Sequence, residues 1–424
     1  MNTDFCTQLY EFARSDPGRD VWIEVAGEPV LLVQSLASAQ QVLATNASSF
    51  TKTMKAMSQV CGPSRLTENG DDWRYLYRIS QPLLSNVDAK NLVRAVNKHA
   101  LISVEQLLLG AQTGANEANQ ATLLEMTASI MSEVLFNRSI ADFGPGFLED
   151  LAMFFRFIGL NFKPPYSGDA GSAADPRWMH ELGDLRLRWI KRIANIKPTV
   201  RPKDRLLHRL SRMDAGKAAI GGFEYEVLML FGAGSDTTAA TISWAILLLA
   251  QYPDTQQKLR RELEQYWVTD TPDSSEILKN DMLLRFLSEV FRLYPVGPFF
   301  GRRARTRVKV GEHQVDDGVQ VIVSSVGLGR NPNSFANPDA LELFRDPDTR
   351  CPNEATVPFS AGPRRCGGQR IAMIELPIIL AIFLHHLKFD LQHPATITFD
   401  WQVTMHCHGG VPVKISRIPK TLKG

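Results

Sequence analysis

The ten residues Phe359-Ser-Ala-Gly-Pro-Arg-Arg-Cys-Gly-Gly368 decide how the rest of the chain is interpreted. Cys366 is bracketed by glycines, which allow backbone to pass close to a flat group and several N–H groups to turn toward the sulfur. An apolar helix is predicted over about 368–387, directly after the cysteine. The positive end of its dipole, with Arg364 and Arg365 beside the thiol, favours thiolate at neutral pH. Such a thiolate is a good soft ligand for iron, whereas a lone Cys-Gly pair is more typical of a buried structural cysteine.

This stretch resembles the haem-binding loop of the cytochrome P450 superfamily, in which Phe, Gly, Arg, Cys and Gly recur at the same spacing. The five matching residues are Phe359, Gly362, Arg364, Cys366 and Gly368. The resemblance implies that Cys366 is the proximal ligand of the iron in haem b, that Phe359 packs under the porphyrin, and that Arg364 pairs with a haem propionate. A match at five positions is far more specific than a lone glycine pattern.

A second motif, Leu228-Met-Leu-Phe-Gly-Ala-Gly-Ser-Asp-Thr-Thr238, lies inside a long apolar helix. Its glycines each cost about 1 kcal/mol relative to alanine, so some other interaction should compensate. A small residue at Ala233 or Gly234 lets the helix approach a large ligand, and a threonine hydroxyl bonded to a carbonyl loosens the helix. Packing of helices through small residues explains the segment equally well. The segment also resembles the superfamily's oxygen-binding helix, which implies that Ala233 lies at the haem, that Thr237 donates a hydrogen bond during oxygen activation, and that Asp236 relays protons.

A third motif, Glu289-Val-Phe-Arg292, puts two opposite charges on one face of a predicted helix. Such a pair is often an exposed ion pair on the surface of a helix, but here the flanking residues are apolar. If the pair is buried, it needs further hydrogen-bonding partners to offset the cost of desolvation. The superfamily has this pair, joined by a downstream arginine. Arg345 is the counterpart here, because its stretch matches at Pro338, although Leu341 stands where phenylalanine is usual. The implied role of all three charges is structural, fixing the core on the haem side.

Two weaker matches complete the expected haem pocket. Trp73 resembles an aromatic residue that donates to a propionate, and the family has a basic residue four positions later. Tyr77 occupies that position and Arg78 comes one residue late, so the choice between them stays open. Arg302, on the strand after the Glu-x-x-Arg helix, resembles another propionate arginine. Solvated charge explains both matches equally well.

The resemblance also places the substrate pocket, beneath two segments rich in turn-forming residues that are interpreted as lids. The expected pocket components are the segments 54–72 and 164–176, the side chains Met229, Ala233, Val296 and Phe299, and the turn at 404–409. Cys407 between two histidines invites a metal, but neighbours on a strand point to opposite faces and cannot easily share one ion. A hairpin that lines the pocket is the preferred interpretation. The mixture of Met, Phe and Val with Ser, Arg and His indicates neither a pure alkane nor a strongly charged substrate.

Composition excludes several classes of protein. The 424 residues are 44% hydrophobic and 22% charged, with a formal net charge of +2, which excludes disordered and fibrous chains and gives no sign of nucleic-acid binding. Five cysteines without a Cys-x-x-Cys spacing argue against a disulfide framework and a structural zinc site. The amino terminus carries no secretory pattern, and the apolar run 376–384 is about half of what a membrane span needs. A cytoplasmic protein with no membrane association is therefore expected.

The fold class expected is mainly α with small β-sheets (α+β), arranged as a cytochrome P450 fold. Hydrophobic periodicity predicts helices over 88–110, 120–137, 147–161, 178–195, 222–251, 254–267, 281–294 and 368–387. Pro377 should kink or restart the last of these. A hairpin is predicted over 21–33, weakened by Pro29, and two further strands at 308–310 and 319–323 around the turn signal Asp317-Gly318. We expect one domain over residues 1–424 with no fused reductase.

The resemblance implies a haem-thiolate monooxygenase that binds O2, accepts two electrons and two protons, and inserts one oxygen atom into a small organic substrate by hydroxylation or epoxidation. Soluble bacterial members of this kind often serve secondary-metabolite biosynthesis. Electrons are expected from an external ferredoxin or flavodoxin system that docks near Arg350, Arg364 and Arg365. Three alternatives stay open: oxidative coupling or cyclisation without oxygen insertion, a peroxide-driven or rearranging enzyme, and a non-catalytic haem sensor. The second of these tends to lose the Asp-Thr pair, which is intact here.

Overall fold

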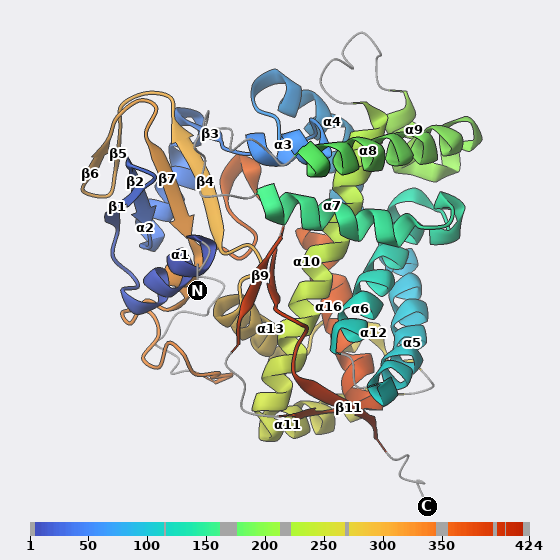
Figure 1. The fold of residues 1–424 in the computed structure, drawn as a ribbon. Coiled ribbons are helices and arrows are strands. Elements are labelled where there is room, and N and C mark those ends of the chain that lie inside the picture. Colours follow the sequence, from blue (N-terminus) through green and yellow to red (C-terminus); the bar gives the residue numbers. More distant parts are fainter. Residues whose placement is uncertain are drawn as a thin grey trace, which may run out of the picture.

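The computed structural model describes residues 5–113, 116–161, 176–212, 222–267, 271–344, 355–392, 397–402 and 404–418. Helices fill most of it and small sheets lie at the edges (Figure 1), which confirms the predicted α+β class. The long helices are α4 (Gly70–Ser85), α5 (Ala89–Thr113), α6 (Asn116–Met131), α7 (Phe147–Asn161), α8 (Pro176–Ile196), α10 (Phe223–Gln251), α11 (Pro253–Glu264), α13 (Asp281–Leu293) and α16 (Gln369–His386). The short helices are α1 (Phe5–Ser15), α2 (Leu36–Gln40), α3 (Lys55–Cys61), α9 (Arg205–Ser211), α12 (Ser274–Ile277) and α14 (Ser325–Gly329).

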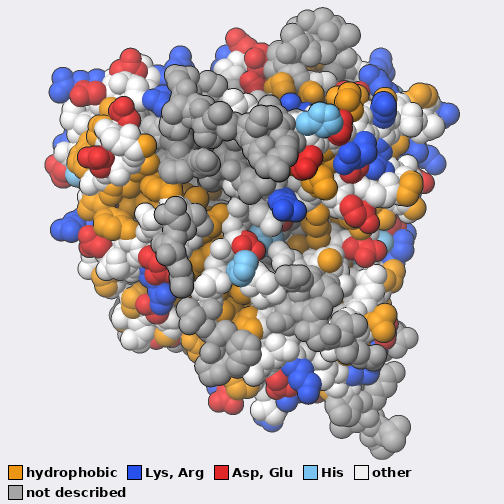
Figure 2. Space-filling view, in the orientation of Figure 1, with side chains coloured by type: hydrophobic (Ala, Val, Ile, Leu, Met, Phe, Trp, Pro, Cys, Tyr) orange, Lys and Arg blue, Asp and Glu red, His pale blue; other side chains and the backbone are white. Residues whose placement is uncertain are grey.

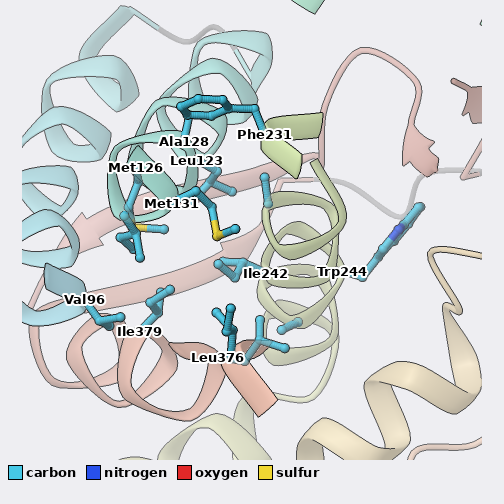
Figure 3. Packing of buried hydrophobic residues seen from close by; sticks show 14 of the residues in the cluster. Val96, Leu123, Met126, Ala128, Met131, Phe231, Ile242, Trp244, Leu376 and Ile379 are labelled. Carbon is cyan, nitrogen blue, oxygen red and sulfur yellow. The ribbon is translucent and has the colours of Figure 1, made fainter. Parts of the chain in front are cut away.

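Helix α10 forms the centre of the molecule. It is apolar on nearly all sides and almost entirely buried, as expected of a helix that neighbours surround. Figure 1 shows it crossing the middle of the fold, and Figure 3 shows side chains of α6 and α16 converging on it. Its contact with α6 is close because Gly234 has no side chain: a Cβ there would overlap the end of Met131. Gly234 therefore serves helix packing, one of the two explanations that the sequence left open.

The largest sheet has five strands in the order β1-β2-β7-β4-β3. The strands are β1 (Val21–Val25), β2 (Glu28–Val33), β3 (Phe50–Lys52), β4 (Phe299–Ala304) and β7 (Gln320–Ser324). The predicted hairpin over 21–33 is confirmed. Pro29 is tolerated because pairing of β2 with β7 begins only at Val30, so no hydrogen bond needs the missing N–H.

The strands expected at 308–310 and 319–323 are confirmed as β5 and β7, but they do not pair with each other. Strand β5 (Val308–Val310) pairs instead with β6 (His313–Val315), and β7 lies between β2 and β4. The turn signal at Gly311, which has φ +55°, closes the shorter hairpin. All five residues of β7 are buried, as a strand in the middle of a sheet requires, so β7 is not free to form an outer hairpin.

The carboxyl-terminal part forms two small hairpin-like sheets. Strand β8 (Leu387–Leu391) pairs with β11 (Val413–Arg417), and β9 (Phe399–Trp401) pairs with β10 (Met405–Cys407). The indole N–H of Trp244 in α10 donates to the carbonyl of Met405 at 2.9 Å, which fastens β10 to the central helix. This contact brings the last strands against α10.

Two further expectations about loops and breaks need correction. The segment 54–72 is not simply irregular, since it contains α3 and the start of α4. Helix α16 runs through Pro377 without a restart, so of the two expected effects only a kink stays a prediction. Most of the other expected lid, 164–176, lies outside the described residues.

Helix α16 is also long and apolar enough to cross a membrane by length and composition. However, 61% of that window is buried inside the protein, as in a core helix. Figure 2 shows hydrophobic side chains gathered on the part of this face that α1 and the five-stranded sheet occupy; the exposed large apolar residues of these elements are Phe12 and Trp22.

Candidate active site

The cysteine loop enters α16 in a tightly constrained conformation. The N–H of Cys366 donates to the carbonyl of Phe359 at 2.8 Å, and the ring of Phe359 meets Phe291 edge to face at 5.2 Å. Gly362 has φ +65°, and a Cβ there would overlap the carbonyl of Leu43. Only glycine fits this position, because it must adopt the left-handed region and approach neighbouring backbone at the same time.

The sulfur of Cys366 lies in a hollow: the residue is exposed to solvent, yet protein surrounds it closely enough that burial raises the pKa of its thiol. The backbone N–H groups of Gly368 and Gln369 lower this pKa, as do the charges of Arg65 and Lys52, but burial outweighs them. The expected contribution from the start of the helix is confirmed in the N–H groups of Gly368 and Gln369, but the expected net lowering of the thiol pKa is wrong, because burial raises it. A coordinated metal ion removes this penalty, because a thiol that binds a metal is deprotonated.

Four cationic side chains, the cation cluster, gather beside Cys366: Lys52, Arg65, Arg302 and Arg364. Burial lowers the pKa of Lys52 well below its usual range, and the charges of the three arginines lower it further. Burial, followed by the charges of Arg302 and Arg65, lowers the pKa of Arg364 to about 10. Like charges this close repel one another, so the cluster is suited to an anion with more than one negative charge.

Arg364 is held by the start of α4. Its guanidinium donates to the carbonyl of Glu68 at 2.7 Å and to the amide oxygen of Asn69 at 3.1 Å, and lies 4.1 Å from the centre of the Trp73 ring. Asn69 also accepts from the backbone N–H of Lys52 at 3.0 Å. Trp73 thus supports an arginine of the cluster in addition to its expected role toward a propionate.

Arg65 lies beside Tyr77 of α4, the position at which the family resemblance implies a basic residue. Its guanidinium lies 5.3 Å from the centre of the Tyr77 ring and donates to Ser80 and Gln81, each at 2.7 Å. Arg78 is exposed, so Tyr77 rather than Arg78 faces the cluster. Arg65 was not predicted from the sequence, because it lies in the segment 54–72, which was expected to be an irregular loop, and a charged residue in a loop is usually exposed to solvent.

Lys52 and Glu226 were also missed. Lys52 lies opposite Arg302 in the pairing of β3 with β4, a register that no local pattern reveals. Glu226 accepts from the backbone N–H of Arg65 at 2.9 Å, and burial raises the pKa of its carboxyl to about 7. An acid within the apolar run of α10 was the signal that could have found it.

The middle of α10 presents a small exposed surface between buried residues. Ala233 is exposed although the residues before it are buried, and the hydroxyl of Thr237 donates to the Ala233 carbonyl at 2.7 Å. This is the bond from a threonine to a preceding carbonyl that the sequence suggested. The next hydroxyl, that of Thr238, donates to buried Glu375 of α16 at 2.7 Å.

Asp236 does not point to the same side of α10 as Thr237. It is only 3% exposed, and its carboxylate accepts from the Thr404 hydroxyl at 2.5 Å and lies 3.0 Å from Nε2 of His406. The acid and the alcohol of the expected pair therefore occupy different surroundings. Thr404 and His406 belong to the turn that the sequence assigned to the substrate pocket, but they contact Asp236.

A small apolar cavity of about 10 Å³, room for about one water molecule, lies between α3, α7 and α10. Its lining consists of Cys61, Phe154, Phe155, Ile158, Leu228, Met229, Gly232 and Ala233. Of the expected pocket residues, Met229 and Ala233 are among these. Val296 and Phe299 lie elsewhere: the Val296 carbonyl accepts from the N–H of Met405 at 3.0 Å, and the Phe299 ring stacks on Trp401 at 6.4 Å.

Glu289 and Arg292 form a buried ion pair with two parallel hydrogen bonds of 2.7 Å. Arg292 is 0% and Glu289 1% exposed. The remaining donors of the guanidinium bind the carbonyls of Gly329 at 2.9 Å and Ala340 at 2.7 Å, and that of Pro338. These carbonyls supply the further partners that a buried pair requires. The expected third charge, Arg345, lies outside the described residues.

The described residues fit a haem by three observations. The thiol of Cys366 is exposed in a hollow, the cation cluster beside it suits two propionates, and Ala233 leaves α10 without a large side chain at its exposed point. Arg65 connects the two sides, because it contacts Glu226 of α10 and lies against Gly367 of the cysteine loop. Among the described residues, no group of three or more His, Cys, Asp or Glu side chains could hold a metal ion on its own.

Comparison with known proteins agrees with this geometry. The family model described as "Cytochrome P450" matches residues 180–408. The chain is similar to "Cytochrome P450 4V2" of Homo sapiens, with 34% identity over 43% of this chain and 36% of the relative. It is similar to "Cytochrome P450 72A11" of Arabidopsis thaliana, with 26% identity over 83% of this chain and 73% of the relative. "Geranylhydroquinone 3''-hydroxylase CYP76B74" of Arnebia euchroma is 32% identical over 46% of this chain and 41% of the relative.

The chain spans only about a third of the length of the first of these relatives. All three come from an animal or from plants, so the expected likeness to soluble bacterial members stays a prediction. The family model nevertheless covers more than half of the 424 residues and extends over α10 and the cysteine loop. The chain belongs to the cytochrome P450 family.

Proposed function

We propose that the chain is a haem-thiolate monooxygenase that inserts one oxygen atom from O2 into a small, largely apolar organic molecule. The observation that carries this proposal is the exposed thiol of Cys366, set at the start of α16 beside four cations and joined through Arg65 to α10. A haem with two propionates explains why a thiol and several partly buried cations gather at one point.

The residues of the chain divide the work as follows. Cys366 would hold the haem iron through its thiolate, and the iron would supply the activation of O2. The cation cluster would bind the propionates and so orient the group. Thr237 holds a hydroxyl next to the exposed Ala233 surface, where it can donate a hydrogen bond to a reactant. Asp236 holds and transfers protons from the far side of α10.

The substrate is expected to be apolar because the pocket next to Ala233 is lined only by apolar side chains and a neutral thiol. Burial raises the pKa of the Cys61 thiol in that lining to about 12. Hydroxylation or epoxidation in secondary-metabolite biosynthesis is part of the proposal. Its support is the apolar lining together with a relative that is by name a geranylhydroquinone hydroxylase.

The test is a spectrum followed by product analysis. Protein made in cells supplied with a haem precursor should bind haem b, and its reduced carbon monoxide complex should absorb at the wavelength typical of thiolate ligation. Cys366→His should shift that band toward the position seen in globins. With a bound apolar ligand and ¹⁸O2, one labelled oxygen should enter the product. A globin-like band in the wild type overturns the proposal, and a product that has lost two hydrogens without gaining oxygen identifies oxidative coupling instead.

Electrons are proposed to come from an external ferredoxin or flavodoxin system that docks near the cysteine loop, with the protein in the cytoplasm. Among the arginines expected there, Arg365 is exposed, Arg364 is engaged with Trp73, and Arg350 lies outside the described residues. Arg365→Glu should therefore slow reduction by a ferredoxin at low salt several-fold. Lys414→Glu, an exposed charge change on β11 at the other end of the fold in Figure 1, is the matched control. Equal rates for both variants would contradict docking at this face.

A further inference from the structure

A buried polar group, the Asp236 cluster, joins three elements on the side of α10 away from Thr237. It consists of Asp236, Thr404, His406 and Gln120. Thr404 donates to one oxygen of the Asp236 carboxylate at 2.5 Å, and Nε2 of His406 lies 3.0 Å from the other. Nδ1 of His406 lies 2.8 Å from the side-chain amide nitrogen of Gln120 in α6. Asp236, Thr404 and His406 are 3%, 4% and 4% exposed.

This arrangement satisfies both carboxylate oxygens of Asp236. A buried carboxylate without hydrogen-bonding partners is costly, and the two donors supply such partners and fix its direction. Burial alone would lower the pKa of His406, but the Asp236 carboxylate and its hydrogen bond outweigh burial and raise that pKa above its usual value. The imidazole and the carboxylate therefore share a charge-assisted contact inside the protein.

Both protonation states of His406 can be accommodated. A neutral imidazole accepts at Nδ1 from the amide of Gln120, as the structure shows. An imidazolium needs an acceptor there, which the Gln120 amide supplies when it turns over and presents its oxygen. The cluster can thus gain or lose one proton without leaving a buried polar group unpaired.

Other charged groups near His406 lie on the same hairpin. Asp400 on β9 stands opposite His406 in the strand pairing and also raises its pKa. Asp400 is itself engaged by exposed His408 at 2.7 Å. Burial raises the pKa of Cys407 to about 11, so this thiol is neutral. The strongest partner of His406 is Asp236 on α10.

Asp236 and Thr237 are neighbours on a helix, so their side chains leave it about 100° apart. The Thr237 side faces the exposed Ala233 surface, and the Asp236 side faces β10. We propose that His406 is the positioning residue of Asp236: it fixes the direction of that carboxylate, and the protonation of His406 itself sets how tightly the carboxylate is held while it passes on a proton. This inference rests on the proposed monooxygenase function.

The first test measures the coupling itself and needs no turnover. Protein labelled with ¹⁵N in its histidines is titrated by NMR, and the signal of His406 is identified by its loss in His406→Gln. We expect Asp236→Asn to lower the proton-binding constant of His406 at least tenfold, and Thr404→Val and Gln120→Ala to change it less. If Asp236→Asn leaves the proton-binding constant of His406 unchanged, the inference is overturned, even if the protein proves to be a haem-thiolate enzyme.

The second test uses the haem-loaded enzyme with His408→Gln as the matched control on the same hairpin. The fraction of NAD(P)H electrons that reaches product is measured from pH 5.5 to 9. His406→Leu should shift the pH dependence of this fraction, His406→Gln should restore part of it because its amide can still donate to Asp236, and His408→Gln should leave it unchanged. Equal profiles for wild type and His406→Leu contradict the inference. A carbon monoxide complex of the globin type contradicts the proposed function but leaves the NMR result valid.

Discussion

Replacing Glu289 by glutamine should destabilise the protein by about 3 kcal/mol, because it removes one charge from a fully buried ion pair. Loss of one partner from such a pair costs about 3–5 kcal/mol, since the other charge is left uncompensated. We expect the lower end here. Arg292 keeps hydrogen bonds to the carbonyls of Gly329 and Ala340, and glutamine can still accept one bond from the guanidinium.

A matched control lies on the same helix. Asp281 and Arg285 form an ion pair at 2.6 Å, but their side chains are 69% and 42% exposed. Asp281→Asn should therefore cost only about 0.2–1 kcal/mol. The free energy of unfolding is measured by urea titration, with helix content followed by circular dichroism and haem release followed by absorbance. A difference of 3 kcal/mol changes the unfolding equilibrium about 150-fold, well above the error of the titration.

The reasoning is refuted if Glu289→Gln and Asp281→Asn destabilise the protein equally. Replacing both charges, as Glu289→Leu with Arg292→Leu, distinguishes a charge effect from damage to packing. The double variant should be more stable than Glu289→Gln, because no buried charge is left alone in it. If the double variant is less stable than the single one, the hydrogen bonds from Arg292 to the carbonyls of Gly329 and Ala340 contribute more than the uncompensated charge costs.

Three further predictions concern the site. Thr237→Ala should raise the hydrogen peroxide released per NAD(P)H consumed several-fold, because the hydroxyl beside Ala233 is lost; unchanged coupling would count against its role. Gly362→Ala should reduce both haem content and the melting temperature, since φ is +65° and a Cβ would overlap backbone; full haem occupancy would contradict this. Burial raises the pKa of Glu375 from 4.5 to about 7. The folded protein therefore binds this proton more tightly than the unfolded chain does. The bound proton contributes about 3 kcal/mol to the free energy of unfolding, and this contribution is lost as the pH rises from 4.5 to 7. Glu375→Gln should flatten the stability profile in that window, and an unchanged slope in urea titrations would show that Glu375 is not its source.

The sequence predicted those parts of the fold that local patterns encode. The helices expected over 222–251 and 281–294 appeared within one residue of these bounds as α10 and α13, whereas the 16-residue helix α4 was not among the predicted ranges. The pairing of β7 could not be predicted, because Asp317-Gly318 is a strong turn signal while the partner strands lie far away in the chain. Register in a mixed sheet depends on which faces become buried, and that information is not local.

In the candidate site, too, the residues within local motifs could be predicted and those that depend on distant partners could not. Cys366 and Thr237 were found because family motifs surround them. The direction of Asp236 could not be predicted, since it depends on His406, a residue 170 positions later. The position of Arg65 in the site was hidden for the same reason, because its partners lie on α4 and α10.

The cysteine motif is short, but the cations that surround it come from distant parts of the chain. Lys52, Arg65 and Arg302 come from separate segments, and each lies in a stretch that reads as ordinary solvated charge. They converge because β3 pairs with β4 and because α4 packs against the cysteine loop. Repulsion among these like charges destabilises the folded protein. An anionic group bound beside Cys366 should therefore stabilise the protein, and more so at low salt than at high salt.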